Sequence, residues 1–282
     1  MSHASDKASI CYLICVYNDQ QGLDTSLQSI YADDLLADIL IIDDGSTPAI
    51  TMNIVTPEQT GQTTIYTDLI ALERNAGLPN ALNAGVKVIL DRGYQYLARL
   101  DAGDTVNKGR LAAQLSYLKT NPDIAIVGTG VRAFDPQSGE TLFEFDNPSD
   151  PKEVSKTLKI RNCVPHPTTM IRTEVFKECG LYDPKSIYAE DYELWRRVNQ
   201  RKQLANLSEI YVNKEISPQQ ITSISRKAGI LSSLRTQLHY MNIFSIWCWI
   251  GLVRSCFALL IPRNLQLNMR YKTRNKAKAS AS

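Results

Sequence analysis

The strongest constraint on the fold is an alternation between short apolar runs and segments whose apolar residues recur at helical spacing. Ile10–Val16 and Ile39–Ile42 are continuous apolar runs without a helical period, which is typical of buried strands, and Tyr94–Leu100 is read as another strand. The alternation predicts an α/β fold in which a mainly parallel sheet is flanked by helices on both faces. Helices are expected over residues 23–30, 78–89 (ending at Gly93) and 111–118.

Other patterns add to this sheet. Thr63–Tyr66 is expected to form a further strand, and Ile124–Phe134 and Thr141–Phe145 flank turn residues, which predicts a hairpin. The last dozen residues are rich in Lys, Ala and Ser and are expected to be disordered.

Acidic residues stand where two predicted strands end. Asp43-Asp44-Gly45-Ser46 follows one strand and Asp101-Ala102-Gly103-Asp104 follows another. Ligands of parallel sheets bind beyond the carboxyl ends of the strands. The first cluster can accept hydrogen bonds from a base or a ribose, and the second suits a hard divalent cation that bridges phosphate oxygens. Each cluster alone could be a solvated turn, but two in one sheet favour a binding site.

Three further motifs carry candidate chemistry. Arg74–Leu78 opens a helix, where an anion could bind or where Asn75 could simply cap the helix. Ala189–Arg197 places two carboxylates at a helix start, either for general base catalysis or to complement the helix dipole. His166–Thr169 holds a histidine between two prolines, which is read either as a substrate loop or as a structural turn.

Taken together, the motifs resemble family 2 glycosyltransferases of the GT-A fold. They occur in the family's order across about residues 10–225. The matching segments are Val16-Tyr17-Asn18, Asp43-Asp44-Gly45-Ser46, Arg74-Asn75 with Gly77-Leu78, Ala81, Asn83 and Gly85, Leu100-Asp101-Ala102-Gly103-Asp104, and Ala189-Glu190-Asp191.

The resemblance implies a Rossmann-like nucleotide-diphospho-sugar transferase that inverts the anomeric centre. Asp191, with Glu190 beside it, would deprotonate the acceptor hydroxyl. Asp101 and Asp104 would hold Mg2+ or Mn2+. The donor, with a UDP-sugar favoured, would lie against Val16, Tyr17, Asn18, Asp43, Asp44, Arg74, Asn75, Gly77, Asp101 and Ala102. An acceptor or donor loop would include His166, Thr168 and Arg196.

The sequence departs from the family pattern at two places that concern the cation. Gly103 stands where the third residue of the metal motif is usually aspartate, and residues 216–222 lack the histidine of many relatives. Arg74 or Arg196 is therefore an alternative source of positive charge for the diphosphate. The Gln-x-x-Arg-Trp signature of processive relatives is absent, so one sugar is expected to be added per acceptor.

Charge divides the chain into an acidic body and a basic tail. Residues 216–282 contain ten Lys and Arg and no Asp or Glu, whereas the whole chain has a net charge of only +2. We expect a glycosyltransferase domain over 1–225 and a helical tail over 226–282. Ile243–Ile261 is apolar, but basic residues flank both its ends and Arg254 lies within it, which disfavours a span. A re-entrant or surface-lying helical tail at an anionic membrane is expected, and a buried core helix with a disordered basic end is the alternative.

The remaining features exclude other classes and set the location. The chain has no GxGxxG dinucleotide motif, no P-loop and no GxSxG elbow, and its basic run lacks the features of a nucleic-acid-binding module. The polar N-terminus and the scattered cysteines indicate no secretory signal and a reducing compartment. The expected function is glycosyl transfer to a lipid-linked saccharide in surface polysaccharide or lipopolysaccharide synthesis, on the cytoplasmic face of the membrane. The alternative is a catalytically inactive nucleotide-sugar-binding module tethered to a membrane complex.

Overall fold

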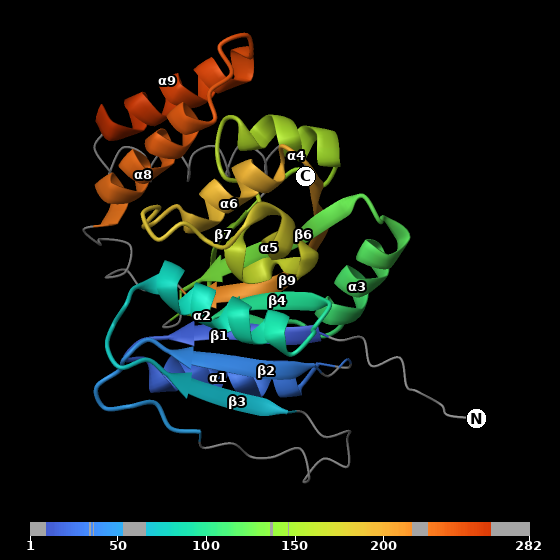
Figure 1. Cartoon of the computed structure of the whole chain (residues 1–282), viewed down its shortest axis with the longest axis vertical. Coiled ribbons are helices and arrows are strands. Elements are labelled where there is room, and N and C mark those ends of the chain that lie inside the picture. Colours follow the sequence, from blue (N-terminus) through green and yellow to red (C-terminus); the bar gives the residue numbers. More distant parts are fainter. Residues whose placement is uncertain are drawn as a thin grey trace.

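A nine-stranded sheet runs through the part of the chain that the computed structural model describes (Figure 1). The described residues are 10–33, 35, 37–52, 66–135, 138–145, 147–215 and 225–260. The strands are β1 (Ile10–Val16), β2 (Asp38–Asp43), β3 (Thr67–Ala71), β4 (Tyr96–Asp101), β5 (Asp104–Val106), β6 (Ile124–Phe134), β7 (Thr141–Glu144), β8 (Met170–Arg172) and β9 (Gln203–Glu215). Their order in the sheet is β3-β2-β1-β4-β8-β6-β9-β5, with β7 paired to β6.

The first half of the sheet is parallel, as the sequence predicts. β1 lies between β2 and β4 and is parallel to both, and β3 extends the sheet beside β2. The register sets Val16 opposite Asp43 and Cys15 opposite Asp101. The acidic ends of β2 and β4 therefore meet on either side of the end of β1.

The second half of the sheet is mixed, although its longest pairing, between β6 and β9, is also parallel. β8 is antiparallel to both β4 and β6, β5 is antiparallel to β9, and β6 and β9 run parallel. The pair β6–β7 is antiparallel because its connection is the short turn of the predicted hairpin, which cannot form the helical crossover that adjacent parallel strands need.

Helices cover both faces of the sheet, and each face has its own apolar core. The helices are α1 (Gln20–Tyr31), α2 (Leu78–Asp91), α3 (Arg110–Thr120), α4 (Pro151–Leu158), α5 (Glu174–Cys179), α6 (Glu190–Val198), α8 (Ser225–His239) and α9 (Ile246–Leu260). α1 and α3 pack on one core with Tyr12 and Ile14 of β1, whereas α2, α4 and α6 pack on the other with Leu13. This alternation follows from the two-residue period of a strand.

Most predicted elements are confirmed to within a few residues. The predicted strand Thr63–Tyr66 lies largely outside the described residues, and the strand of that region is β3, which begins at Thr67. The predicted disorder of the last dozen residues also lies outside the described part of the chain.

The described part of the predicted tail, up to residue 260, forms the hairpin α8–α9, which packs on the body through α6 and the segment after α4 (Figure 1). Gln237 donates to the carbonyl of Ile160 at 2.9 Å, and Lys156 lies 4.5 Å from the ring centroid of Trp247. Within the described residues, no helix combines the length and apolarity that a membrane crossing requires.

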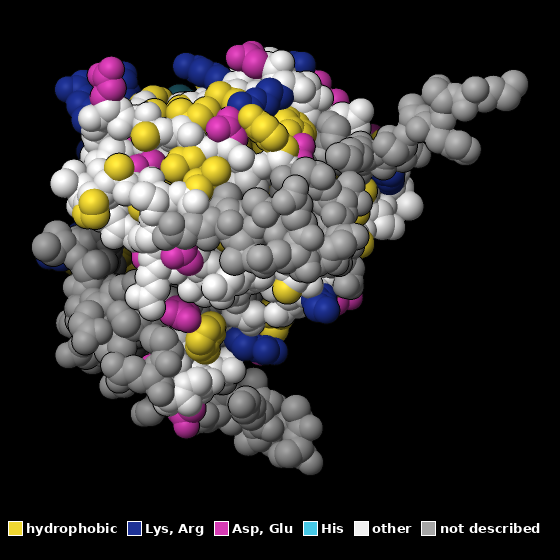
Figure 2. Space-filling view, turned by 90° about the horizontal axis from the view of Figure 1, so that it is seen from below, with side chains coloured by type: hydrophobic (Ala, Val, Ile, Leu, Met, Phe, Trp, Pro, Cys, Tyr) yellow, Lys and Arg dark blue, Asp and Glu magenta, His cyan; other side chains and the backbone are white. Residues whose placement is uncertain are grey.

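The face seen in Figure 2, below the view of Figure 1, carries both signs of charge. Acidic and basic side chains are dispersed among each other over the described part of this face. The apolar side chains that α9 leaves exposed, described below, belong to a different region of the molecule.

One glycine determines how closely α9 can approach the body. A Cβ at Gly251 would lie 2.4 Å from the carbonyl oxygen of Lys159, whereas a Cβ at Gly229 of α8 would meet only ordinary contacts, the nearest at 3.8 Å. We predict that Gly251→Ala lowers the free energy of unfolding by about 1–3 kcal/mol, because the helix must move off a backbone that cannot yield. Gly229→Ala should be neutral or stabilising by about 0.5–1 kcal/mol. Urea denaturation of both variants checks this, and equal stabilities would contradict it.

Candidate active site

The loops at the carboxyl ends of β1 and β2 are held by carboxylates that bind backbone amides. Asp43 accepts from the amides of Ser46 (2.9 Å) and Ile50 (3.2 Å). Asp44 accepts from the amides of Ala76 (2.7 Å) and Gly77 (3.0 Å), just before α2 begins. Both carboxylates are buried. They fix the shape of the predicted nucleotide pocket and tie its β2 loop to the start of α2.

A second set of contacts joins the loops that follow β1 and β2. The amide of Asn18 donates to Ser46 Oγ, and Asn18 Oδ1 accepts from the amide of Thr47, both at 2.8 Å. Gly45 has φ +73°, and a Cβ there would lie 2.4 Å from the backbone carbon of Arg74. Only glycine fits this approach, so the Arg74 loop rests directly on the Asp44 loop.

The structure brings the predicted nucleotide residues to one edge of the sheet. Val16 is buried at the end of β1, and Tyr17 exposes 51% of its surface. Arg74 and Asn75 are exposed on the loop that Asp44 holds, before α2 begins at Leu78. An aromatic ring and an arginine thus lie exposed on adjacent loops at this edge.

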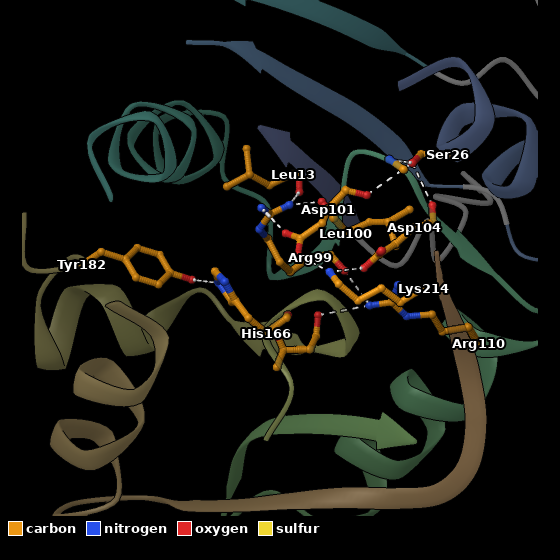
Figure 3. Close-up of polar contacts among 12 residues, drawn as sticks. Leu13, Ser26, Arg99, Leu100, Asp101, Asp104, Arg110, His166, Tyr182 and Lys214 are labelled. Atoms are coloured by element: carbon orange, nitrogen blue, oxygen red, sulfur yellow. Dashed lines mark hydrogen bonds and ion pairs between the residues drawn. The ribbon is translucent and has the colours of Figure 1, made fainter. Parts of the chain in front are cut away.

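Four charged side chains form a cluster at the end of β4 (Figure 3). Arg99 Nη2 lies 2.7 Å from Asp101 Oδ1. Lys214 Nζ lies 3.6 Å from Asp101 Oδ2 and 3.4 Å from Asp104 Oδ2. Ser26 supports the turn, since its hydroxyl donates to the carbonyl of Asp104 at 2.7 Å and accepts from the amide of Gly103 at 3.0 Å. Gly103, with φ +90°, shapes the turn and cannot bind a cation through a side chain.

The two carboxylates of this cluster differ in pKa because their surroundings differ. Burial alone would raise the pKa of Asp101, but Arg99 and Lys214 outweigh it and lower the pKa to about 2. Burial raises the pKa of Asp104 against the opposing effect of Lys214. At neutral pH Asp101 is therefore the firmly ionised member of the pair.

The predicted cation site can be tested against this geometry. Asp101 and Asp104 each direct one oxygen at a single positively charged atom, the ammonium nitrogen of Lys214. Two carboxylates that supplement substrate phosphates are the oxygen donors that Mg2+ commonly uses in proteins. No group of three or more His, Cys, Asp or Glu side chains suited to a metal occurs among the described residues. The donor set therefore fits a cation that a diphosphate helps to bind.

The predicted catalytic base lies at the first turn of α6. Asp191 Oδ1 accepts from the amide of Tyr192, and Oδ2 accepts from Asn162 Nδ2, both at 2.6 Å. Burial raises the pKa of Asp191 to about 7, and the neighbouring Glu190 and Asp101 add to the rise. Burial also raises the pKa of Glu190, with Asp101 again contributing. The base and the β4 cluster are thus close enough to interact electrostatically.

His166 borders the cluster as a neutral side chain. Burial, reinforced by Arg99, lowers its pKa to about 3, and its Nε2 lies 3.0 Å from the hydroxyl of Tyr182 (Figure 3). At neutral pH it therefore contributes hydrogen bonding rather than positive charge.

Two residues predicted for the acceptor or donor loop make hydrogen bonds within the fold. Thr168 is fully buried; its hydroxyl donates to the carbonyl of Pro165 and accepts from the amide of Thr129. Arg196 donates to the carbonyls of Leu158 (3.1 Å) and Tyr240 (2.7 Å), so it joins α6 to α4 and to the end of α8. Arg196 thus lies on the face of α6 that packs against the hairpin, and its place in an acceptor or donor loop stays a prediction.

Sequence reasoning missed three residues of the site. Arg99 could have been found, since an arginine within an apolar strand two residues before Asp101 shares its face. Lys214 had no local signal, because only the antiparallel pairing of β5 and β9 sets it opposite Asp104. Asn162 likewise reaches Asp191 from a loop 29 residues away in sequence.

The fold and the acidic strand ends define a class, and comparison with known proteins names it. The model of the family "Glycosyl transferase family 2" matches residues 11–180. The chain belongs to this family and is a glycosyltransferase.

Among relatives, the amylovoran biosynthesis glycosyltransferase AmsE of Erwinia amylovora is 28% identical over 189 residues, which cover 66% of this chain and 68% of AmsE. An Escherichia coli UDP-Gal:alpha-D-GlcNAc-diphosphoundecaprenol beta-1,3-galactosyltransferase is 25% identical over 279 residues. These residues cover 94% of this chain and 96% of the galactosyltransferase.

Solved structures show the same GT-A fold. Staphylococcus aureus TarS 1–349 in complex with UDP-GlcNAc has a TM-score of 0.60 at 14% identity, over 89% of this chain and 70% of TarS 1–349. The mannosyltransferase PcManGT of Pyrobaculum calidifontis, in complex with GDP-Man and Mn2+, has a TM-score of 0.56 at 12% identity. The match covers 97% of this chain and 76% of the PcManGT chain.

The raised pKa of Asp191 predicts a pH-dependent cost to stability. The pKa in the folded protein is about 7, above the value of about 3.9 for an unfolded aspartate, so the ionised carboxylate destabilises the fold above pH 7. This cost disappears below about pH 4, where both states are protonated. We predict that the free energy of unfolding of Asp191→Asn, relative to wild type, increases between pH 4 and pH 8. Urea denaturation across this range checks it, and a constant difference would contradict it.

Proposed function

We propose that the protein transfers one sugar from a nucleotide-sugar donor to a hydroxyl of a lipid-linked saccharide, with inversion at the anomeric carbon. The observation that carries this proposal is Asp191, a carboxylate with a pKa of about 7 that two hydrogen bonds orient beside the β4 cluster. A general base is most efficient when its pKa lies near the working pH.

The proposed step is a single in-line displacement. An Asp191 oxygen takes the proton of the acceptor hydroxyl, and the acceptor oxygen forms a bond to the anomeric carbon. The bond from that carbon to the diphosphate oxygen breaks on the opposite face, and the nucleoside diphosphate leaves with the electron pair. Asn162 and the amide of Tyr192 hold the carboxylate in position throughout.

Negative charge grows on the departing diphosphate and needs stabilisation. Asp101 and Asp104 would hold a divalent cation, Mg2+ or Mn2+, which when bound neutralises part of this charge. The Arg74 loop lies at the same edge of the sheet and would face the nucleotide, at the positive end of the α2 dipole. A UDP-sugar is the favoured donor, supported by TarS in complex with UDP-GlcNAc and by the UDP-Gal-dependent relative.

The acceptor and the location are inferred from the hairpin α8–α9. Its outer surface exposes Ile243, Phe244, Ile246, Trp249, Val253, Phe257 and Leu260, from 48% for Trp249 to 92% for Phe244. Apolar and aromatic side chains beside a basic segment favour binding in the plane of an anionic membrane surface. The E. coli relative, whose name gives a diphosphoundecaprenol-linked acceptor, matches 94% of this chain. We therefore propose a peripheral enzyme of cell-surface polysaccharide or lipopolysaccharide synthesis on the cytoplasmic face of the membrane.

The catalytic proposal predicts the behaviour of one variant. Asp191→Asn removes the base and should lower the turnover number about 10²–10⁴-fold while leaving UDP affinity within a factor of two. In the wild type, the turnover number should rise with pH through about 7 and then level off, since the ionised carboxylate is the active form. Transfer from a panel of nucleotide sugars to lipid-linked saccharides, alongside UDP calorimetry, measures both quantities.

This experiment also separates the proposal from its alternative. A wild-type protein that binds UDP but transfers no sugar from any donor would support the inactive nucleotide-sugar-binding module. Full activity in Asp191→Asn would contradict the assigned base.

The membrane proposal makes a second prediction. The double variant Phe244→Ser, Trp249→Ser should bind vesicles containing 30–50% phosphatidylglycerol, roughly tenfold or more weakly than wild type, because two exposed apolar anchors are lost. The control Tyr66→Ser removes a side chain of similar exposure (54%) beside β3, at the far edge of the sheet. Vesicle flotation measures the effect, and equal binding of wild type and double variant would contradict the proposal.

A further inference from the structure

Lys214 occupies the position toward which both carboxylates of the β4 cluster point. Antiparallel pairing of β5 and β9 sets its Cα opposite that of Asp104. Its ammonium nitrogen lies 3.4 Å from Asp104 Oδ2 and 3.6 Å from Asp101 Oδ2. The side chain of Lys214 is 37% exposed, whereas that of Asp104 is only 4% exposed. The ammonium therefore separates a buried carboxylate from the open side of the site.

Both carboxylates of the cluster already have a positively charged partner. Arg99, with 1% exposure, contacts the second oxygen of Asp101 at 2.7 Å, in addition to the ammonium of Lys214 near both carboxylates. A divalent ion would have to enter beside the ammonium against repulsion at short range, which is strong where little water screens it. The protein thus supplies its own cation at the place where a metal would bind.

We propose that Lys214 competes with a divalent cation for Asp101 and Asp104, so that the protein without nucleotide has little affinity for the metal. This inference rests on the divalent cation of the proposed function. The four-carbon stem of lysine allows the ammonium to move when an anionic diphosphate arrives. Lys214 would then turn toward the phosphates and release the carboxylates to a cation that binds together with the nucleotide.

The test is Mn2+ binding to the full chain without nucleotide, measured by the electron paramagnetic resonance signal of free Mn2+. We expect weak binding by wild type, with a dissociation constant on the order of 1 mM or higher, and at least about tenfold tighter binding by Lys214→Met, which keeps the length but removes the charge. Lys214→Arg keeps the charge and should behave like wild type. Lys202→Met is a matched control, because Lys202 also pairs with a carboxylate, Glu178 at 3.2 Å, at similar exposure.

Further measurements fix the site and guard against misfolding. Asp101→Asn added to Lys214→Met should abolish the gain in affinity, and circular dichroism should show that each variant is folded. If Lys214→Met does not fold, Lys214→Gln replaces it. The expected weak Mn2+ binding of the wild type is measured on the wild-type protein alone. Micromolar Mn2+ binding by wild type without nucleotide would overturn the proposal. So would an equal gain in Lys202→Met, or a gain that survives Asp101→Asn.

Neither measurement uses a donor or an acceptor. A failed transfer assay therefore leaves this proposal untouched, and its own failure leaves the assignment of glycosyl transfer standing.

Discussion

The balance of charge at the end of β4 is the constraint on which the site depends. Asp104 is almost fully buried, and an isolated buried carboxylate is unfavourable unless a cation or hydrogen bonds compensate it. Compensation comes from Lys214 on β9, whose segment lies more than a hundred residues further along the chain. Pairing of β5 with β9 is thus stabilised by the ion pair between Lys214 and Asp104 as well as by backbone hydrogen bonds. It also makes β5 the outer strand of the mixed half of the sheet.

The carboxylates of the site do different work because their partners differ. Asp43 and Asp44 each accept two backbone amides and brace the loops. Asp101 is surrounded by cations and remains ionised, whereas Asp191 lies beside another acid and holds its proton more tightly. The same functional group therefore provides rigidity at β2, attraction for a cation at β4 and, as we propose, basicity at α6.

Sequence patterns predicted the parts of the molecule that local order determines. The apolar runs of β1 and β2 and the helical spacing of α2 are local, so the parallel half and its acidic ends could be placed in advance. The antiparallel strands β5 and β8, three residues each, are too short to leave a pattern. The contacts of Arg196 with the carbonyls of Leu158 and Tyr240 left no sequence pattern, because they depend on how α6 packs against α4 and the hairpin. Lys214 required knowledge of tertiary pairing.

The packing of α6 has a consequence for geometry at a lipid surface. Asp191 stands at the first turn of this nine-residue helix, and Glu193, Arg196 and the hairpin residue Tyr240 are joined by hydrogen bonds along its length. Nine residues of α-helix span only about 13 Å. If the hairpin rests on a membrane, α6 would therefore hold the reacting hydroxyl at a constant distance from the lipid surface. Acceptors would then be selected by how far their sugar stands from the bilayer as well as by which sugar they carry.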